Sequence, residues 1–262
     1  MQFKKNIIKI IKKVIPAQFH PEAYLGTLIL NKSSNNVLSG PFQGLKYNEK
    51  DESIGSAYWP KLIGSYEKEL HDVIEKLLIS ENKVDAIVNI GAAEGYYAIG
   101  FAIRKPNVQI IAFESQSKGR DLIQNLAENN GVANKISTYG FCNPDILLKS
   151  LLKLKNPLII CDVEGYELEL LNPKLIDFKN AHLLVEVHDF IDNRIGVMLR
   201  ERFEDSHKIT QIYQRQRDRN DFPITNLYTQ ILPFNYLNVF LNEHRPEVMY
   251  WYFMEPQQLQ QS

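Results

Sequence analysis

The chain has 262 residues, a length that allows one or two domains at about 150 residues each. Hydrophobic residues make up 44% of it and charged residues 23%, as in ordinary soluble globular proteins, which excludes collagen-like, disordered and disulfide-scaffold classes. The 30 Lys and Arg residues nearly balance the 31 Asp and Glu residues, so no overall basic field points to a nucleic-acid partner.

The first fifteen residues predict a basic amphipathic helix that ends at Pro16, because apolar residues and lysines are interspersed there without an acid. Two interpretations of this helix stay open: weak contact with an anionic membrane surface, or packing on the rest of the chain or on a partner. Residues 17–60 contain short apolar pieces separated by Asn, Ser and Gly, which predict short strands and turns rather than long helices. We expect residues 1–60 to form an N-terminal helix and a lid or cap extension.

From residue 61 onward, amphipathic helices and apolar strands follow each other regularly. Leu70, Ile74 and Leu77 recur at helical spacing and predict a helix with one buried face. Strands are predicted over 84–90, 108–113, 136–139, 157–161 and 183–187 with helices between them, followed by a helix past 193, a strand at 209–214, a helix near 234–241 and a strand at 248–254. Strands this apolar are covered on both faces and pair in parallel when helices join them. The sequence therefore predicts a doubly wound α/β domain.

Small residues follow the first predicted strand, in the run Gly91-Ala-Ala-Glu-Gly95. Ligands of open parallel sheets bind beyond the carboxyl ends of the strands, and small residues let a ligand approach the backbone there. Glu114 ends the second strand, at the place where a carboxylate binds the two hydroxyls of a ribose. An adenosine-containing ligand fits both features.

A dinucleotide is the first such ligand to consider. Its G-x-G-x-x-G pattern fails here, because Ala93 and Tyr96 stand at the second and third glycine positions. S-adenosylmethionine (SAM) has no pyrophosphate and tolerates Gly-x-x-x-Gly after a strand. We therefore expect SAM as the cofactor, with a nicotinamide-dependent oxidoreductase as the alternative.

Three acids within six residues follow the fourth predicted strand: Asp162, Glu164 and Glu167. Bringing carboxylates together is costly unless they bind cations, hydrogen-bond donors or a substrate. Capping of the next helix would explain one of them. The others indicate a functional site at this strand end.

The chain resembles the FkbM-type family of class I SAM-dependent methyltransferases. The resemblance rests on residues 162–167, on the small-residue loop after the first strand and on segments 64–70, 184–188 and 251–256, and it covers residues 40–256. It implies a Rossmann-like α/β fold with a mostly parallel seven-stranded sheet, an antiparallel last strand and helices on both faces. It also implies an enzyme that methylates a hydroxyl of a sugar or another small molecule, with residues 61–262 as the SAM-binding domain.

The resemblance also implies which residues bind the cofactor: Asn89, Gly91, Ala93, Gly95, Glu114, Phe141, Cys142 and Asp162. The small residues would shape the methionine and ribose pocket, Glu114 would bind the ribose hydroxyls, and Phe141 and Cys142 would flank the adenine. Asp162 would face the reaction centre. Asn89 stands where many class I enzymes have an acid, so it offers an amide oxygen without a formal charge.

Methyl transfer to a neutral hydroxyl needs groups that position the oxygen and remove its proton. Asp162, Glu164 and His188 are the candidate bases, and the sequence leaves their roles open. No metal ligand is assigned, since the C-x-x-C and H-x-x-x-H spacings are absent. Mg²⁺ held by Asp162, Glu164 and Asp189 stays an alternative.

The expected partner is a small-molecule or glycan substrate, and no nucleic acid, because the Asp-Val-Glu-Gly loop is negative and lacks the pattern that stacks a flipped base. Arg215, Arg217 and Arg219 are interpreted as a solvated loop or a phosphate site. The two cysteines, Cys142 and Cys161, and the absence of a membrane-length apolar stretch favour the cytoplasm. A homo-oligomer and a catalytically silent methyltransferase-fold subunit also stay open.

Overall fold

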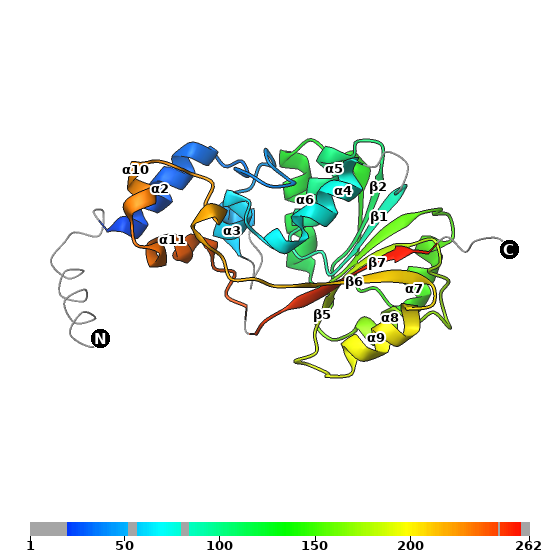
Figure 1. Cartoon of the computed structure of the whole chain (residues 1–262). Coiled ribbons are helices and arrows are strands. Elements are labelled where there is room, and N and C mark those ends of the chain that lie inside the picture. The colour runs from blue at the N-terminus through cyan, green and yellow to red at the C-terminus, as the bar shows by residue number, and fades with distance from the viewer. Residues whose placement is uncertain (1–19, 52–56, 80–83, 246, 258–262) are drawn as a thin grey trace.

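The computed structural model describes residues 20–51, 57–79, 84–245 and 247–257 (Figure 1). The basic helix predicted for the first fifteen residues lies outside this part of the chain. Within the described ranges, every helix is too short or too polar to cross a lipid bilayer.

Seven strands form one sheet in the order β3-β2-β1-β4-β5-β7-β6. The strands are β1 (Ala86–Ile90), β2 (Gln109–Phe113), β3 (Ile136–Tyr139), β4 (Pro157–Cys161), β5 (His182–Val187), β6 (His207–Tyr213) and β7 (Tyr250–Pro256). β1 to β5 run parallel, whereas β7 pairs antiparallel with both β5 and β6. The predicted fold class is confirmed: a Rossmann-like, mostly parallel seven-stranded sheet with an antiparallel last strand.

The chain changes its winding direction between β1 and β4. From β1 it proceeds outward through β2 and β3, and it then returns to the other side of β1 as β4, with Ile90 opposite Cys161 at the carboxyl ends. A ligand crevice is expected beyond the carboxyl ends of strands at such a switch point. The loops that follow β1, β2 and β4 are therefore brought to one edge of the sheet.

Helices cover both faces of the sheet (Figure 1). One face carries α4 (His71–Ile79), α5 (Tyr96–Arg104) and α6 (Ser117–Asn129), and the other carries α7 (Pro144–Leu151), α8 (Glu167–Leu170) and α9 (Ile195–Phe203). Successive residues of a strand point to opposite faces of the sheet. Ile87 belongs to the hydrophobic cluster on the face of α4, α5 and α6, and Val88 to the cluster on the face of α7, α8 and α9. The strands are thus buried on both sides, as predicted. Short 3-10 helices lie at η2 (Glu49–Asp51), η3 (Lys68–Leu70), η4 (Ala133–Lys135) and η5 (Arg219–Asp221).

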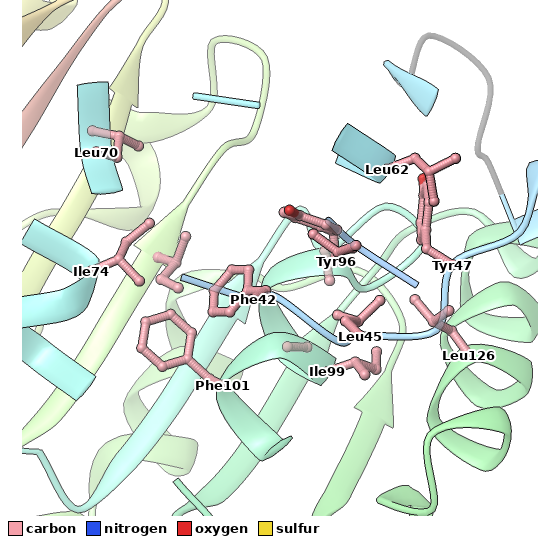
Figure 2. Close-up of a cluster of buried hydrophobic side chains, with 14 of the residues drawn as sticks. Phe42, Leu45, Tyr47, Leu62, Leu70, Ile74, Tyr96, Ile99, Phe101 and Leu126 are labelled. Carbon is pink, nitrogen blue, oxygen red and sulfur yellow. The ribbon is translucent and has the colours of Figure 1, made fainter. Parts of the chain in front are cut away.

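Residues 42–47 pack onto the α5 face of the sheet domain (Figure 2). Phe42 lies against Gly100, where an added Cβ would come within 2.4 Å of the Phe42 ring. Leu45 and Tyr47 belong to the same buried cluster as Tyr96. This part of the N-terminal extension is therefore built into the core of the sheet domain.

Four helices form a cluster beside the sheet, which we call the helical cap (Figure 1). They are α2 (Pro21–Ser33), α3 (Tyr58–Ile63), α10 (Leu227–Ile231) and α11 (Phe234–Leu241). The ring centroids of Tyr24 and Tyr228 are 4.8 Å apart, and those of Trp59 and Phe240 are 5.0 Å apart. The cap thus combines the N-terminal extension with an insertion between β6 and β7.

The expectation that residues 17–60 contain no long helix is wrong, because α2 has 13 residues. Pro21 begins this helix, and Ser34 ends it in the left-handed conformation. Leu25, Ile29 and Ser33 are its buried residues, one for each turn. A stripe this narrow is enough to pack α2 against helices from distant parts of the chain. It leaves only a weak helical pattern of hydrophobic residues in the sequence.

Candidate functional site

A cavity of about 400 Å³, here called the large cavity, lies beyond the carboxyl ends of β1, β2 and β4. Two smaller cavities adjoin it at Asp162. The inner cavity, of about 50 Å³, is lined by Asn89 and Glu94 among others, and the outer cavity, of about 180 Å³, is lined by His188 and Arg245 among others. Asp162 lines all three cavities, so the site is organised around the end of β4.

The loop after β1 is shaped by backbone contacts with its neighbours. Gly91 has a φ of 75°, and a Cβ added there would lie 1.7 Å from the carbonyl oxygen of Asp162. Ala93 adopts a φ of 50°, which is uncommon for a residue with a side chain, and its N–H donates to Glu114 Oε2 at 2.8 Å. The other carboxylate oxygen of Glu114 accepts from the N–H of Gln116 at 2.8 Å. Glu114 therefore fixes the β1 loop while it also lines the large cavity.

The structure brings most of the predicted cofactor residues together. The large cavity is lined by Gly91, Ala93, Glu114, Phe141, Cys142 and Asp162. Gly95 does not line the described cavities; it precedes α5 with a φ of 93° and packs against Ile99 and Ile123. Asn89 lines the inner cavity, is 2% exposed, and its Oδ1 has no hydrogen-bond partner among the described residues. Burial raises the pKa of the Cys142 thiol to about 12.

The three candidate bases lie next to each other at the outer cavity. His188 Nε2 is 3.5 Å from Asp162 Oδ1 and 3.5 Å from Glu164 Oε2. Glu164 has a φ of 50°, and Gly165 follows with a φ of 100°. Positive φ at a residue with a side chain stores strain, and such strain concentrates at functional sites. The backbone after β4 is thus held in a conformation that brings both carboxylates to the histidine.

Glu167 orients His188, a role that sequence reasoning did not assign to it. Both side chains are buried, and His188 Nδ1 lies 2.5 Å from Glu167 Oε1. A carboxylate only accepts hydrogen bonds, so Nδ1 is the donor and Nε2 faces the cavity. Burial opposes a charge on the ring, but the hydrogen bond and the charge of Glu167 outweigh it and raise the pKa of His188.

Asp162 titrates near neutrality. Burial, followed by the negative charges of Glu67 and Glu164, raises its pKa to about 7. Its side chain is nevertheless 41% exposed, because it borders the cavities. Burial and the charge of Asp162 likewise raise the pKa of Glu186. The carboxyl ends of β4 and β5 therefore hold carboxyl groups whose raised pKa values oppose a full negative charge.

Arg245 balances part of this charge and was not singled out from the sequence. Its guanidinium forms ion pairs with Glu67, Glu186 and Glu243. The side chain is 12% exposed, and each of the three carboxylates is less exposed than that. A guanidinium offers five donors in a fixed plane, which suits a site with several carboxylates. In the sequence these charged residues lie mostly at distant positions, so no local pattern indicates that they pair with Arg245.

A second buried ion pair fastens α3 to the β1 loop. Lys61 pairs with Glu94, which is 0% exposed and also accepts from the Tyr47 hydroxyl at 2.9 Å. Lys61 also lies 4.6 Å from the centroid of the Tyr66 ring. The charge of Lys61 therefore reaches the small-residue loop directly.

Two interpretations of charged residues are corrected. The run of arginines is engaged within the protein: Arg217 pairs with Glu69 and Glu243, Arg215 pairs with Asp221, and Arg219 donates to the carbonyls of Thr229 and Leu232. Arg215 is nevertheless 44% exposed, as the solvated-loop interpretation expects, while all three arginines are bound within the protein instead of standing free for a phosphate. The carboxylate of Asp189 accepts from the Tyr250 hydroxyl at 2.5 Å and from the N–H of Gly196 at 2.8 Å, so it anchors α9 instead of joining the cluster at Asp162.

No protein-family model matches this sequence, and no curated protein matches it either. The solved structures similar to it include the O-methyltransferase TomG from Streptomyces achromogenes in complex with SAM, at 12% identity and a TM-score of 0.48 over 87% of this chain and 96% of that one. A proposed O-methyltransferase from Klebsiella pneumoniae has 11% identity and a TM-score of 0.45 over 94% of each chain.

The C-terminal domain of precorrin-6Y C5,15-methyltransferase from Rhodobacter capsulatus has 9% identity and a TM-score of 0.42 over 69% of this chain and 85% of that one. Likeness at this level carries no information about substrate or chemistry, so the fold assignment rests on the strand order itself. The resemblance to the FkbM-type family stays a prediction.

Proposed function

We propose that this protein is a SAM-dependent O-methyltransferase of the FkbM type that acts on a hydroxyl of a small molecule or glycan. The observation that carries this proposal is the position of Asp162 and Glu164, which line both the large cavity and the outer cavity. A methyl donor in the first cavity and an acceptor in the second would meet at these two carboxylates.

The residues of the large and inner cavities fit SAM. Glu114 presents a carboxylate at the end of β2, where ribose hydroxyls bind in sheets of this kind. The Phe141 ring is 57% exposed and is available to cover an adenine. In the inner cavity, the unpartnered Oδ1 of Asn89 is an acceptor for the ammonium group. Once bound, SAM supplies an electrophilic methyl group.

The chain's own residues would prepare the acceptor. Asp162, Glu164 and His188 border the outer cavity, where they would orient the acceptor hydroxyl and take up its proton. Ala57 and Met249, from the connections to the helical cap, wall the same cavity and would limit access of water. A dry, oriented hydroxyl is what an in-line displacement at the methyl carbon requires.

Calorimetric titration with S-adenosylhomocysteine, the product of SAM, tests the cofactor assignment. We expect saturable binding, and we expect Glu114→Ala to weaken it about tenfold or more because this change removes a buried, charge-assisted contact and releases Ala93. Glu128→Ala, on an exposed part of α6, is the matched control. Binding of a nicotinamide dinucleotide in place of S-adenosylhomocysteine would favour an oxidoreductase.

Mass spectrometry of sugar and polyketide acceptors incubated with SAM tests the transfer itself, through a gain of one CH₂ unit. Asp162→Asn should abolish turnover while binding of S-adenosylhomocysteine is largely kept. An unchanged rate would remove Asp162 from the reaction. Binding without transfer to any acceptor class would favour the silent-subunit alternative.

A further inference from the structure

Two carboxylates and one imidazole converge at the border between the large and outer cavities. Among the residues that the structure describes, Asp162, Glu164 and His188 form a group in which one ligand atom from each side chain lies within 4.8 Å of the others. Asp162 and Glu164 line both cavities, and His188 lines the outer one. The group therefore stands where a bound molecule in either cavity could reach it.

The surroundings of His188 are those of a metal-binding histidine. His188 is 1% exposed, and its Nδ1 is held by Glu167, which is 0% exposed. Metal-binding histidines typically donate the other ring N–H to a carboxylate in this way, which fixes the ring and makes the free nitrogen more basic. With Nδ1 as the donor, the lone pair of Nε2 points toward the two carboxylates. Among the described residues, the charged groups that face Nε2 are the carboxylates of Asp162 and Glu164.

The distances suit a small cation. Nε2 lies 3.5 Å from an oxygen of each carboxylate. Ligand atoms about 2.0–2.2 Å from a metal ion are about 3.0–3.5 Å apart in octahedral and tetrahedral sites. A cation between the three atoms is attracted by both carboxylates and by the lone pair of the neutral imidazole. The three ligand atoms lie within 4.8 Å of one another, and rotation of the Glu164 side chain, which is 75% exposed, would bring its oxygen closer to the other two.

The neighbouring acids have other partners and do not compete for these roles. Arg245 engages Glu67 and Glu186, and Tyr250 and Gly196 engage Asp189. Mg²⁺ held by oxygen ligands that include Asp189 is therefore not what the site favours. An imidazole together with two carboxylates suits first-row transition metals better than Mg²⁺, which prefers oxygen ligands alone.

We propose that Asp162, Glu164 and His188 bind a divalent first-row transition-metal ion, such as Mn²⁺ or Co²⁺, with Glu167 as the residue that positions the imidazole. Three protein ligands leave coordination positions open for water or a substrate oxygen, as in catalytic metal sites. The ion would therefore give an oxygen-bearing acceptor a fixed point of attachment beside the methyl donor. With the ion bound, the three side chains would act on the acceptor through the ion instead of taking up its proton themselves. That consequence rests on the proposed function, whereas binding of the ion does not.

The test is a titration of the full chain, stripped of metal with a chelator, using Mn²⁺ followed by electron paramagnetic resonance and Co²⁺ followed by visible absorption. We expect one saturable site for each ion and a Co²⁺ spectrum typical of mixed nitrogen and oxygen ligands. Glu164→Gln should weaken binding about tenfold or more, and Glu167→Gln about 10- to 100-fold. Glu164 is largely exposed, so its variant keeps the fold.

Glu169→Gln is the matched control, since Glu169 is an exposed acid five residues further along the same segment and lies outside the group. It should bind both ions as the unchanged protein does. The proposal is overturned if no saturable site is found, or if Glu164→Gln and Glu169→Gln behave alike. The titrations contain no methyl donor, so they would succeed even if the proposed methyl transfer were wrong, and their failure would leave binding of S-adenosylhomocysteine intact.

Discussion

At the scale of single residues, the site depends on backbone conformations that side chains rarely permit. Gly91, Ala93 and Glu164 all have positive φ, and all three line the large cavity. Two of them carry a side chain and bear strain that the surrounding contacts must hold. The bend after β1 and the bend after β4 also touch, because Gly91 meets the carbonyl of Asp162.

Replacing Gly91 by Ala should be severely destabilising. The new Cβ would lie 1.7 Å from the Asp162 carbonyl oxygen, so both bends would have to move. Forced overpacking typically costs about 1–3 kcal/mol, and a left-handed backbone at Ala adds about 1–2 kcal/mol. We expect a loss of about 3 kcal/mol or more in the free energy of unfolding, measured with urea, together with loss of S-adenosylhomocysteine binding.

Gly131→Ala is the control for this substitution. Gly131 has a φ of 68°, but an added Cβ would meet nothing within 4 Å, so only the backbone penalty of about 1–2 kcal/mol remains. Equal losses for the two variants would show that the contact with Asp162 is not what makes glycine necessary at position 91.

At the scale of elements, ion pairs join segments that are far apart in the sequence. Arg245, which lies just before β7, reaches Glu186 on β5 and Glu67 next to η3. Lys61 of α3 reaches Glu94 in the loop after β1. These contacts fix the connections of the helical cap over the carboxyl ends of the strands, which is where the outer cavity forms.

Arg245→Met should destabilise the protein by about 3–5 kcal/mol, because it leaves the buried carboxylates of Glu67 and Glu186 without their cation. Glu243 keeps its ion pair with Arg217. The unfolding free energy in urea measures this loss. Arg194→Met removes an exposed partner of Asp192 and should change stability little. If the two variants unfold at the same urea concentration, the Arg245 pairs do not hold these elements together.

At the scale of the whole molecule, stability should fall in acid partly through Glu94. Burial alone would raise its pKa, but the charge and hydrogen bond of Lys61 lower it below the ordinary value of 4.5. As the pH falls, Glu94 therefore binds a proton in the unfolded chain at a higher pH than in the folded protein. Its contribution to stability is complete above about pH 4.5 and is lost as the pH falls through the lower pKa of the folded protein.

The double variant Lys61→Met with Glu94→Gln tests this assignment. Its unfolding free energy, followed from about pH 6 to about pH 3, should fall less steeply than that of the unchanged protein because one depressed carboxyl is gone. If the unfolding free energy of the double variant falls with pH as steeply as that of the unchanged protein, other groups cause the acid sensitivity. Glu69 and Asp221 are candidates, since their pKa values are also lowered.

The helical cap shows where prediction from the sequence stopped. Strands such as β3 (Ile136–Tyr139) and β4 (Pro157–Cys161) were predicted with the bounds that the structure gives them, since a short apolar run bounded by turns is a local signal. The helix α2 was missed because its buried Leu25 and Ile29 belong to the same hydrophobic cluster as residues of α11, about 200 residues further along the chain. Hydrophobic periodicity in a sequence reveals a helix only when the buried face of that helix is wide.

The sequence by itself determined the sheet, the glycine-containing bend after β1 and the group of acids after β4, because apolar runs and residues with special backbone conformations act within a few neighbouring positions. Only the tertiary structure decided that Glu167 orients His188, that Arg245 meets Glu67 and Glu186, and that the arginine run is engaged internally. The partner of a charged side chain depends on which distant segments meet in the fold. A single charged residue forms no repeating pattern in the sequence that would identify its partner.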